Sequence, residues 1–257
     1  MELIVISTGS KKGNCYALRA SDGCSLLLDF GCRWNDIARG IDYRVSDVAG
    51  ALLTHEHGDH MAAFERVISM GIPVFTNQGA FNVIKARYGE YAIILPEKRK
   101  FMIDRFGVTP FQVPHTTRDE EGNIVPCMNY GYHITHPEMG QLVYMTDLEF
   151  SPVSFQKAKI EHLLCEVNYC EDIVTDLQGE ANYSHRVLGH MGFETFKSKI
   201  LLQNKSERLR TVTVCHMSDT AADIGRILAE TQQIAGRNVA VNIAAPGLKV
   251  KLDKMPF

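Results

Sequence analysis

The chain begins with short apolar runs that alternate with polar turns. The runs Leu3–Ile6, Cys15–Leu18 and Ser25–Phe30 are separated by segments rich in Gly, Ser, Lys and Asp. Apolar runs of this length, bounded by such turns, predict β-strands rather than helices. Because the turns are short, the strands are expected to pair as successive hairpins.

Farther along the chain, strand-like and helix-like segments alternate to the end. Strands are expected at Val48–Thr54, Pro73–Thr76, Val108–Val113, Asn129–Thr135, Gln141–Thr146, His162–Val167, Thr211–Val214, Asn238–Ala244 and Leu248–Leu252. Helices are expected at Trp34–Arg39, Met61–Met70, Gln78–Tyr88, Glu194–Leu202 and Ala221–Ile234. The charged segment Arg118–Asn123 is expected to be an exposed loop. We find no linker, repeat or low-complexity stretch, so we expect residues 1–257 to form a single domain of two sheets with helices outside.

Composition narrows the possible partners. With 45% hydrophobic and 22% charged residues in 257, the chain resembles an ordinary soluble globular protein and needs no disulfide framework. Its net charge of −3 provides no global basic field. The positive charge needed to bind a nucleic acid would therefore have to come from a local basic patch or from a bound metal ion.

Cysteine usage and the N-terminus indicate a cytoplasmic protein. The seven cysteines form no Cys-x-x-Cys pair, and their odd number favours reduced, mostly buried thiols. The apolar run at the N-terminus is too short for a signal peptide and has no basic segment before it. No run approaches the ~20 apolar residues needed to span a bilayer, so we expect no membrane partner.

The strongest chemical signal is the segment His55-Glu56-His57-Gly58-Asp59-His60, directly after an apolar strand. Three imidazoles and a carboxylate so close together are typical ligands of zinc and similar ions. His55 and His57 could bind one ion, while Asp59 and His60 reach a second. Gly58 is expected to let the backbone turn without a Cβ clash. A solvated polar loop or a helix cap is the alternative interpretation, and the complete pattern disfavours it.

Six residues cannot complete two metal shells, because zinc takes about four ligands per ion. Further ligands are expected at strand ends, where His115, Asp147 and His216 follow apolar runs. Asp147 could bridge both ions. The competing histidines are His133 and His162, which belong to strands, and His136, which precedes Pro137 in a turn that we expect to be exposed.

These residues resemble the signature of the metallo-β-lactamase superfamily. Several segments also resemble its YycJ/WalJ-type subgroup, namely Ser7–Tyr16, Leu27–Gly31, Glu166–Asn168, Gly189–Met191 and Cys215–Ser218. The resemblance implies an αββα four-layer sandwich with two metal ions at one edge of the paired sheets. It implies that one ion is held by His55, His57 and His115, the other by Asp59, His60 and His216, and that Asp147 bridges. Zn²⁺ is favoured, with Mn²⁺ or Fe²⁺ as alternatives, because such ligands suit all three.

The subgroup is associated with phosphodiester hydrolysis, including 5′-to-3′ exonuclease activity on DNA. The resemblance therefore predicts a dinuclear metal-dependent hydrolase that attacks nucleic acid, DNA rather than RNA, with an activated hydroxide. Asp59 is expected to orient that hydroxide, and His190 to contact phosphate or protonate the leaving group. Asn168 and His185 are weaker candidates for substrate contacts.

Three other functions remain open at this point. A small-molecule ester, thioester or lactone hydrolase would use the same hydroxide on a carbonyl. A catalytically inactive metal-binding regulatory protein and a diiron oxidoreductase are the others. The chain departs from the subgroup at Tyr169-Cys170, where His-Asp is usual, and at Thr116-Thr117 after His115. These departures leave the metal ligands intact and the substrate undecided.

Overall fold

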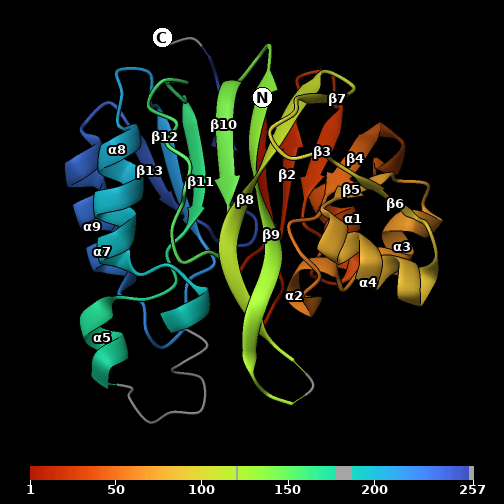
Figure 1. The fold of residues 1–257 in the computed structure, drawn as a ribbon. Coiled ribbons are helices and arrows are strands. Elements are labelled where there is room, and N and C mark those ends of the chain that lie inside the picture. The colour runs from red at the N-terminus through yellow and green to blue at the C-terminus, as the bar shows by residue number, and fades with distance from the viewer. Residues whose placement is uncertain (120, 177–186, 255–257) are drawn as a thin grey trace.

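The computed structural model describes residues 1–119, 121–176 and 187–254. The described strands form two sheets that lie face to face (Figure 1). In hydrogen-bonded order, sheet A contains β14 (Lys249–Lys251), β1 (Glu2–Ser7), β2 (Cys15–Arg19), β3 (Ser25–Leu28), β4 (Val48–Leu52), β5 (Val74–Thr76) and β6 (Ala92–Ile94). Sheet B contains β13 (Ala240–Ile243), β12 (Thr211–Cys215), β11 (His162–Glu166), β10 (Gly140–Met145), β9 (Ile124–His136), β8 (Phe106–Arg118) and β7 (Phe101–Ile103).

Helices cover the outer face of each sheet (Figure 1). Beside sheet A lie α1 (Trp34–Gly40), α2 (Gly58–Met61), α3 (Phe64–Ser69) and α4 (Gln78–Tyr88), and the 3₁₀ turn Val45–Asp47 precedes β4. Beside sheet B lie α5 (Glu171–Asp176), α7 (Phe193–Thr195), the π-helical turn Phe196–Leu201, α8 (Leu202–Asn204) and α9 (Ile224–Ala235).

Three hydrophobic clusters hold these layers together. One lies between the sheets and includes Leu28 and Leu52 of sheet A and Tyr132 and Leu164 of sheet B. The other two lie between each sheet and its own helices. Burial of apolar surface in three successive interfaces makes a helix–sheet–sheet–helix sandwich, so the predicted fold class is confirmed.

Most of the predicted strands form, and the largest difference is the β8–β9 hairpin. Each strand has thirteen residues, and their pairing runs from Gly107 opposite Thr135 to Arg118 opposite Ile124. The expected loop at Arg118–Asn123 is therefore reduced to the exposed tip of a long hairpin (Figure 1). The sequence pattern missed this extension because polar residues and Pro126 interrupt the apolar alternation.

The prediction that His136 is exposed is wrong. The residue ends β9, pairs with Gly140 of β10 and has only 3% of its surface exposed. Its ring packs against Phe106, with the ring centroids 4.8 Å apart. The turn begins only after His136, so the strand carries the side chain into the core.

Two predicted helices are interrupted, and three short elements besides the 3₁₀ turn were not predicted. The segment expected at Met61–Met70 is divided between α2 and α3, and the segment Glu194–Leu202 contains a π-helical turn. The elements α5, β6 and β7 were missed because each is too short to show a period.

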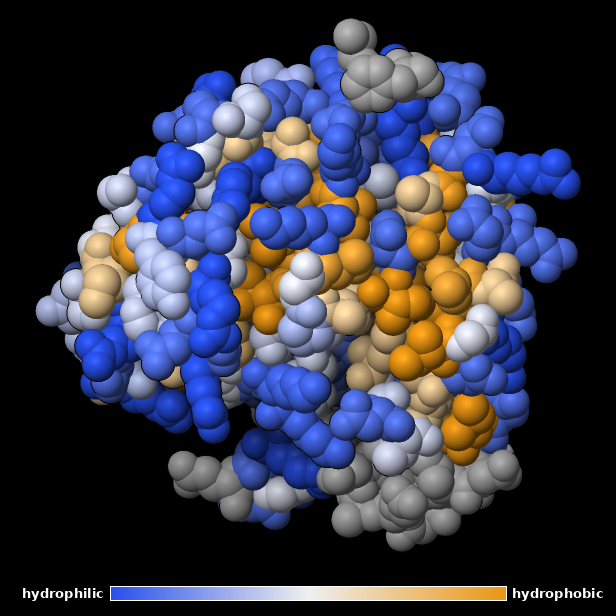
Figure 2. Space-filling view, turned by 180° about the vertical axis from the view of Figure 1, so that it is seen from behind, coloured by the Kyte–Doolittle hydropathy of each residue, from blue (hydrophilic) through white to orange (hydrophobic). Residues whose placement is uncertain are grey.

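Hydrophobic and hydrophilic side chains are unevenly distributed over the surface, and the cysteines form no disulfides. Figure 2 shows hydrophobic side chains gathered in the middle of one face and hydrophilic side chains around them. All seven cysteines are free, and six of them are buried. Within the described ranges, no helix has the length and apolar character needed to cross a membrane.

His162 makes the stability of this fold depend on pH. Its ring is 1% exposed and lies between Thr211 Oγ1 and the Met139 carbonyl. Burial lowers the pKa of His162 to about 4, whereas the unfolded value is about 6.5. The unfolded chain therefore binds this proton more readily, and stability is lost as the pH falls from 6.5 toward 4. We expect a loss of about 2–3 kcal/mol from this residue.

The measurement is urea unfolding near pH 7 and near pH 4.5, for wild type and for His162→Gln. Between these two pH values, the free energy of unfolding should fall by about 2–3 kcal/mol less in the variant than in wild type. An unchanged pH dependence would show that His162 does not contribute to it.

Candidate metal centre

The candidate ligands meet at one edge of the sandwich, where parallel strands end. Strands β3 to β6 and strands β10 to β13 run parallel within their sheets. The segment 55–60 follows β4, Asp147 follows β10 and His216 follows β12. His115 lies inside β8, rather than at the strand end expected from sequence, and reaches the same edge through the extended hairpin. Carboxyl ends of parallel strands are where α/β proteins commonly bind ligands.

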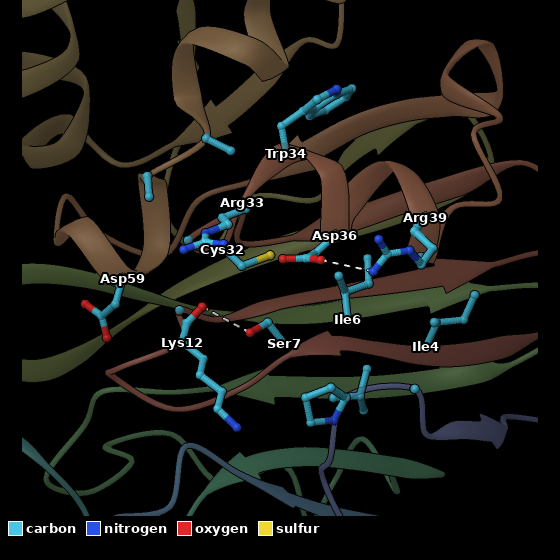
Figure 3. A pocket seen from close by; sticks show the side chains of 18 of the residues that line it. Ile4, Ile6, Ser7, Lys12, Cys32, Arg33, Trp34, Asp36, Arg39 and Asp59 are labelled. Atoms are coloured by element: carbon cyan, nitrogen blue, oxygen red, sulfur yellow. Dashed lines mark hydrogen bonds and ion pairs between the residues drawn. The ribbon is translucent and has the colours of Figure 1, made fainter.

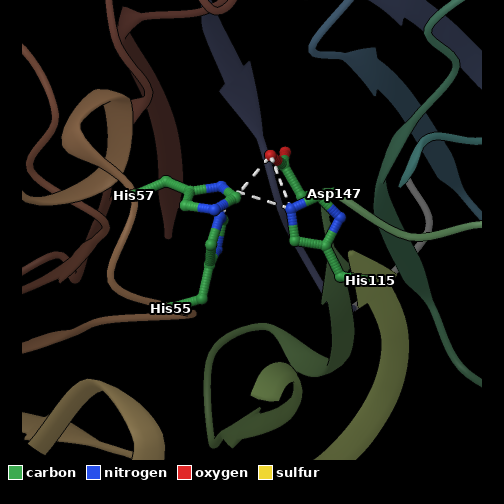
Figure 4. Close-up of side chains that lie close together, drawn as sticks. All are labelled: His55, His57, His115 and Asp147. Atoms are coloured by element: carbon green, nitrogen blue, oxygen red, sulfur yellow. Dashed lines mark hydrogen bonds and ion pairs between the residues drawn. The ribbon is translucent and has the colours of Figure 1, made fainter. Parts of the chain in front are cut away.

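Four side chains form a first donor set, which consists of His55, His57, His115 and Asp147 (Figure 4). One possible ligand atom from each lies within 4.8 Å of the others. Nε2 of His115 is 3.3 Å from Nδ1 of His57, and Nε2 of His55 is 3.6 Å from Oδ2 of Asp147.

A second donor set contains Asp59, His60, His216 and again Asp147, under the same 4.8 Å limit. Nε2 of His216 is 3.2 Å from Oδ1 of Asp147, and Nε2 of His60 is 3.4 Å from Oδ2. Both sets therefore share one carboxylate. The structure brings all seven candidate ligands together, in two groups that share Asp147.

The chemistry of the two sets fits divalent cations. Two buried ring nitrogens, Nε2 of His55 and Nε2 of His216, have no hydrogen-bond partner among the described residues. A buried polar atom without a partner costs about 1–3 kcal/mol. Both nitrogens face Asp147, and imidazole with carboxylate is a donor combination that Zn²⁺, Mn²⁺ and Fe²⁺ accept.

The electrostatics favour positive charge around Asp147. Burial would raise the pKa of Asp147, but His216 and His60 beside it hold that pKa well below its usual range. Burial opposes protonation of His60 and His216 too, yet Asp147 raises the pKa of each ring well above normal. A deeply buried carboxylate thus stays ionised, which is what a cation-binding centre requires.

Asp29 orients His60, a role that the sequence analysis did not assign. Its Oδ2 lies 2.8 Å from Nδ1 of His60, and Nε2 of the same ring lies 3.4 Å from Oδ2 of Asp147 and 3.1 Å from the Asn14 amide nitrogen. Tyr144 and Thr54 donate their hydroxyls to the same fully buried carboxylate, with the Tyr144 bond 2.6 Å long. A carboxylate behind a ligating histidine fixes its tautomer and ring orientation.

Hydrogen bonds also orient the rings of His115 and His57, in these cases to a carbonyl and a hydroxyl. Nδ1 of His115 donates to the Gly189 carbonyl at 2.8 Å, and Nε2 of His57 lies 2.9 Å from Oγ1 of Thr117. His115 thus directs Nε2, and His57 directs Nδ1, toward the other members of the first set. Thr117 occupies one of the positions where the chain departs from the subgroup pattern, and here it contacts a candidate ligand.

Glu166 joins His190 to His216. Its Oε1 is 2.6 Å from Nδ1 of His190 and 3.2 Å from Nδ1 of His216, and the two rings stack with centroids 5.2 Å apart. Glu166, His190, His216 and Asp147 also satisfy the distance limit for a metal site. Because hydrogen bonds to two rings already engage Glu166, we assign it to positioning rather than to ligation.

Asn168 and His190 lie where a substrate could reach them. Both line a cavity of about 650 Å³ beside the cluster. The Asn168 amide donates to the His216 carbonyl at 3.0 Å, so it holds the backbone of that residue. His185 lies outside the described residues.

The N-terminal hairpin fixes the backbone of the metal loop. The Asn14 backbone N–H donates to the Asp59 carbonyl at 2.7 Å, and the Gly31 N–H donates to the Asn14 carbonyl at 2.9 Å. A Cβ on Gly31 would lie 1.7 Å from the Asp59 carbonyl oxygen, so only glycine allows this approach. Gly58, by contrast, has open space where a Cβ would be and no left-handed φ, so the reason predicted for it is wrong.

Three residues at the centre have left-handed backbone conformations. The φ angles of Asp29, Asp147 and His216 are 54°, 52° and 52°. Each follows a strand of the sandwich, and the turn directs its side chain to the shared edge. Such conformations are uncommon in residues other than glycine and are concentrated at functional sites.

A two-sheet sandwich with helices on both outer faces and a cluster of imidazoles and carboxylates at the edge defines a metallo-hydrolase fold. The chain matches the model of the beta-lactamase superfamily domain over residues 36–195, more than half of its length, and it belongs to this superfamily. No curated protein matches it in a sequence search.

Solved structures with the metallo-β-lactamase fold resemble almost the whole chain. YhfI from Bacillus subtilis has 18% identity and a TM-score of 0.71, covering 97% of this chain and 98% of YhfI. A diphosphatase of the PhnP family has 14% identity and a TM-score of 0.67, covering 98% of both chains. The short form of human tRNase Z has 14% identity and a TM-score of 0.61, covering 98% of this chain and 99% of that one. At these identities the likeness shows the fold.

We predict that Asp29→Asn weakens metal binding, because the amide cannot support the His60 ring as the carboxylate does. The apparent dissociation constant for Zn²⁺ should rise about 10- to 100-fold, measured by competition with a chromogenic chelator. Asp104→Asn is the matched control, because Asp104 has a similar φ of 51° but is exposed in the β7–β8 turn. Equal affinities in the two variants would contradict the positioning role.

Proposed function

We propose that the protein is a dinuclear metal-dependent phosphodiesterase that acts on nucleic acid as a 5′-to-3′ exonuclease, with DNA preferred over RNA. The observation that carries the proposal is the pair of donor sets that share the buried Asp147. Two cations close together are the usual arrangement of enzymes that displace groups at phosphorus. The proposal also places the chain in the YycJ/WalJ-type subgroup.

In this proposal His55, His57 and His115 hold one ion, Asp59, His60 and His216 hold the other, and Asp147 contributes to both. Zn²⁺ is our first choice for the resident metal and Mn²⁺ or Fe²⁺ the alternatives. When bound, such ions activate water at neutral pH and neutralise charge on phosphoryl oxygens. Asp59 is 23% exposed at its side chain, so it can accept a hydrogen bond from an attacking water.

His190 is our candidate for contact with the substrate. Glu166 holds Nδ1 of His190. The centroid of the His190 ring lies 5.7 Å from that of His115 and 5.2 Å from that of His216. That position, on the wall of the cavity beside both donor sets, suits a phosphate contact or proton transfer to the leaving oxygen. Asn168 would act by holding His216, and His185 remains a candidate from sequence only.

Two structural neighbours support a substrate that contains phosphate. One is named as a tRNase and another as a diphosphatase. An ester, thioester or lactone hydrolase would use the same edge of the fold. The six cationic residues around the cavity next to Asp59, which are analysed below, favour an anionic substrate over a neutral one.

We predict that the metal-loaded protein hydrolyses bis(4-nitrophenyl) phosphate and 5′-phosphorylated DNA, and that Asp59→Ala lowers kcat/KM for both at least about 100-fold. The reason is the loss of a ligand and of a water-orienting carboxylate together. The measurement is nitrophenolate release and gel analysis of end-labelled DNA with Zn²⁺ or Mn²⁺.

Asp104→Asn, in an exposed turn, serves again as the control and should match wild type. Equal activity in wild type and Asp59→Ala would reject the proposal. So would a fully metal-loaded wild type that is inert on phosphodiesters but hydrolyses a lactone or thioester.

A further inference from the structure

A second cavity, of about 1060 Å³, opens on the other side of the loop formed by residues 10–13. Asp59 lies at one end of it, and Arg33 lies between Asp59 and the Asp36–Arg39 pair (Figure 3). We call this cavity the basic groove. Asp59 also belongs to the second donor set, so the basic groove and the candidate metal centre share this residue.

The basic groove carries an excess of positive charge in a chain whose net charge is −3. Six cationic side chains and three carboxylates line it. Lys11 pairs with Asp219 and Arg39 with Asp36. The other four cations are exposed and have no carboxylate within ion-pair distance in the described part of the chain: Lys12, Arg33, Arg66 and Lys249. Cations without a carboxylate partner in a cavity attract a polyanion, and they outnumber the carboxylates of this lining.

Trp34, the single tryptophan of the chain, also lines the basic groove. It is partly buried because it packs against the cluster between sheet A and its helices. The exposed part of Trp34 borders the groove. Aromatic side chains beside a cationic groove are the usual device for binding single-stranded nucleic acid, with bases stacked and phosphates paired.

We propose that the basic groove binds one strand of nucleic acid, with Arg33 and Arg66 contacting its phosphates and Trp34 stacking on a base. The strand would then enter the metal centre past Asp59. This inference rests on the proposed function, because the bound strand would be the substrate of the phosphodiesterase. A groove of this size beside the metal centre suits a polymeric substrate rather than a small ester. It adds a binding surface whose residues, apart from Asp59, are not candidate metal ligands.

The test is binding of a phosphorothioate oligodeoxythymidylate of about 12 nucleotides to the metal-loaded protein, so that binding does not depend on turnover. We expect the oligonucleotide to quench the emission of Trp34, and Trp34→Phe to lack this signal. For Arg33→Gln/Arg66→Gln, fluorescence anisotropy should show a dissociation constant raised at least about tenfold. The slope of log K against log salt should become shallower by about 1.4, since each phosphate contact contributes about 0.7.

Arg237→Gln is the matched control, because Arg237 is exposed after α9 and lies outside the basic groove. Its affinity and salt slope should equal those of wild type. An unchanged emission of Trp34, or an arginine variant with the slope of Arg237→Gln, would overturn the proposal.

The two proposals can fail separately. If bis(4-nitrophenyl) phosphate is hydrolysed and the oligonucleotide does not bind through the arginines, the groove proposal is wrong and the phosphodiesterase proposal survives. If the oligonucleotide quenches Trp34 with the expected salt slope and no phosphodiester is hydrolysed, the groove proposal survives and the phosphodiesterase proposal is wrong.

Discussion

The centre depends on keeping one carboxylate ionised inside the protein. Asp147 is 2% exposed, and a charge so deeply buried is tolerated only with compensating positive charge or hydrogen bonds. Four imidazoles lie within 4 Å of its oxygens, namely His55, His60, His115 and His216. The fold as a whole can be understood as the support that holds these rings around it.

The two sheets contribute to this support in different ways. Sheet A delivers the metal loop after β4, and its N-terminal hairpin fixes that loop through Asn14 and Gly31. Sheet B positions the other candidate ligands, one within β8 and the others after β10 and β12. Tyr144 of sheet B donates its hydroxyl to Asp29 of sheet A, so the orientation of His60 depends on how the two sheets pack. Stability of the sandwich and geometry of the centre are therefore linked.

The fold class and the clustering of the candidate ligands could be predicted from the sequence, because both leave local traces. Dense imidazoles after an apolar run reveal the metal loop, and polar residues after strands point to His115, Asp147 and His216. Asp29 and Glu166 lie in segments that resemble the subgroup, but the sequence assigns no supporting role to either residue. Their partners lie far away in sequence, and no pattern along the chain reveals which ring a distant carboxylate will face.

The errors have the same origin. Gly58 was given a steric role that belongs to Gly31, because the crowding comes from a backbone segment brought near by folding. His136 was expected to be exposed since it precedes a proline, but β9 continues through it. The length of the β8–β9 hairpin was also hidden, because its outer half does not pack on a sheet that would impose apolar alternation.

The left-handed backbone at Asp29, Asp147 and His216 has a consequence for folding. Glycine would relax each turn, but it would remove the functional group for which the turn exists, so the chain retains about 1 kcal/mol or more of strain at each position. Ligands that bind only the native state add their binding energy to its stability. Cation binding would thus compensate the strain, and part of the folding free energy would be gained only when the ions arrive. The supply of metal in the cell would then influence how much of the protein persists as well as how active it is.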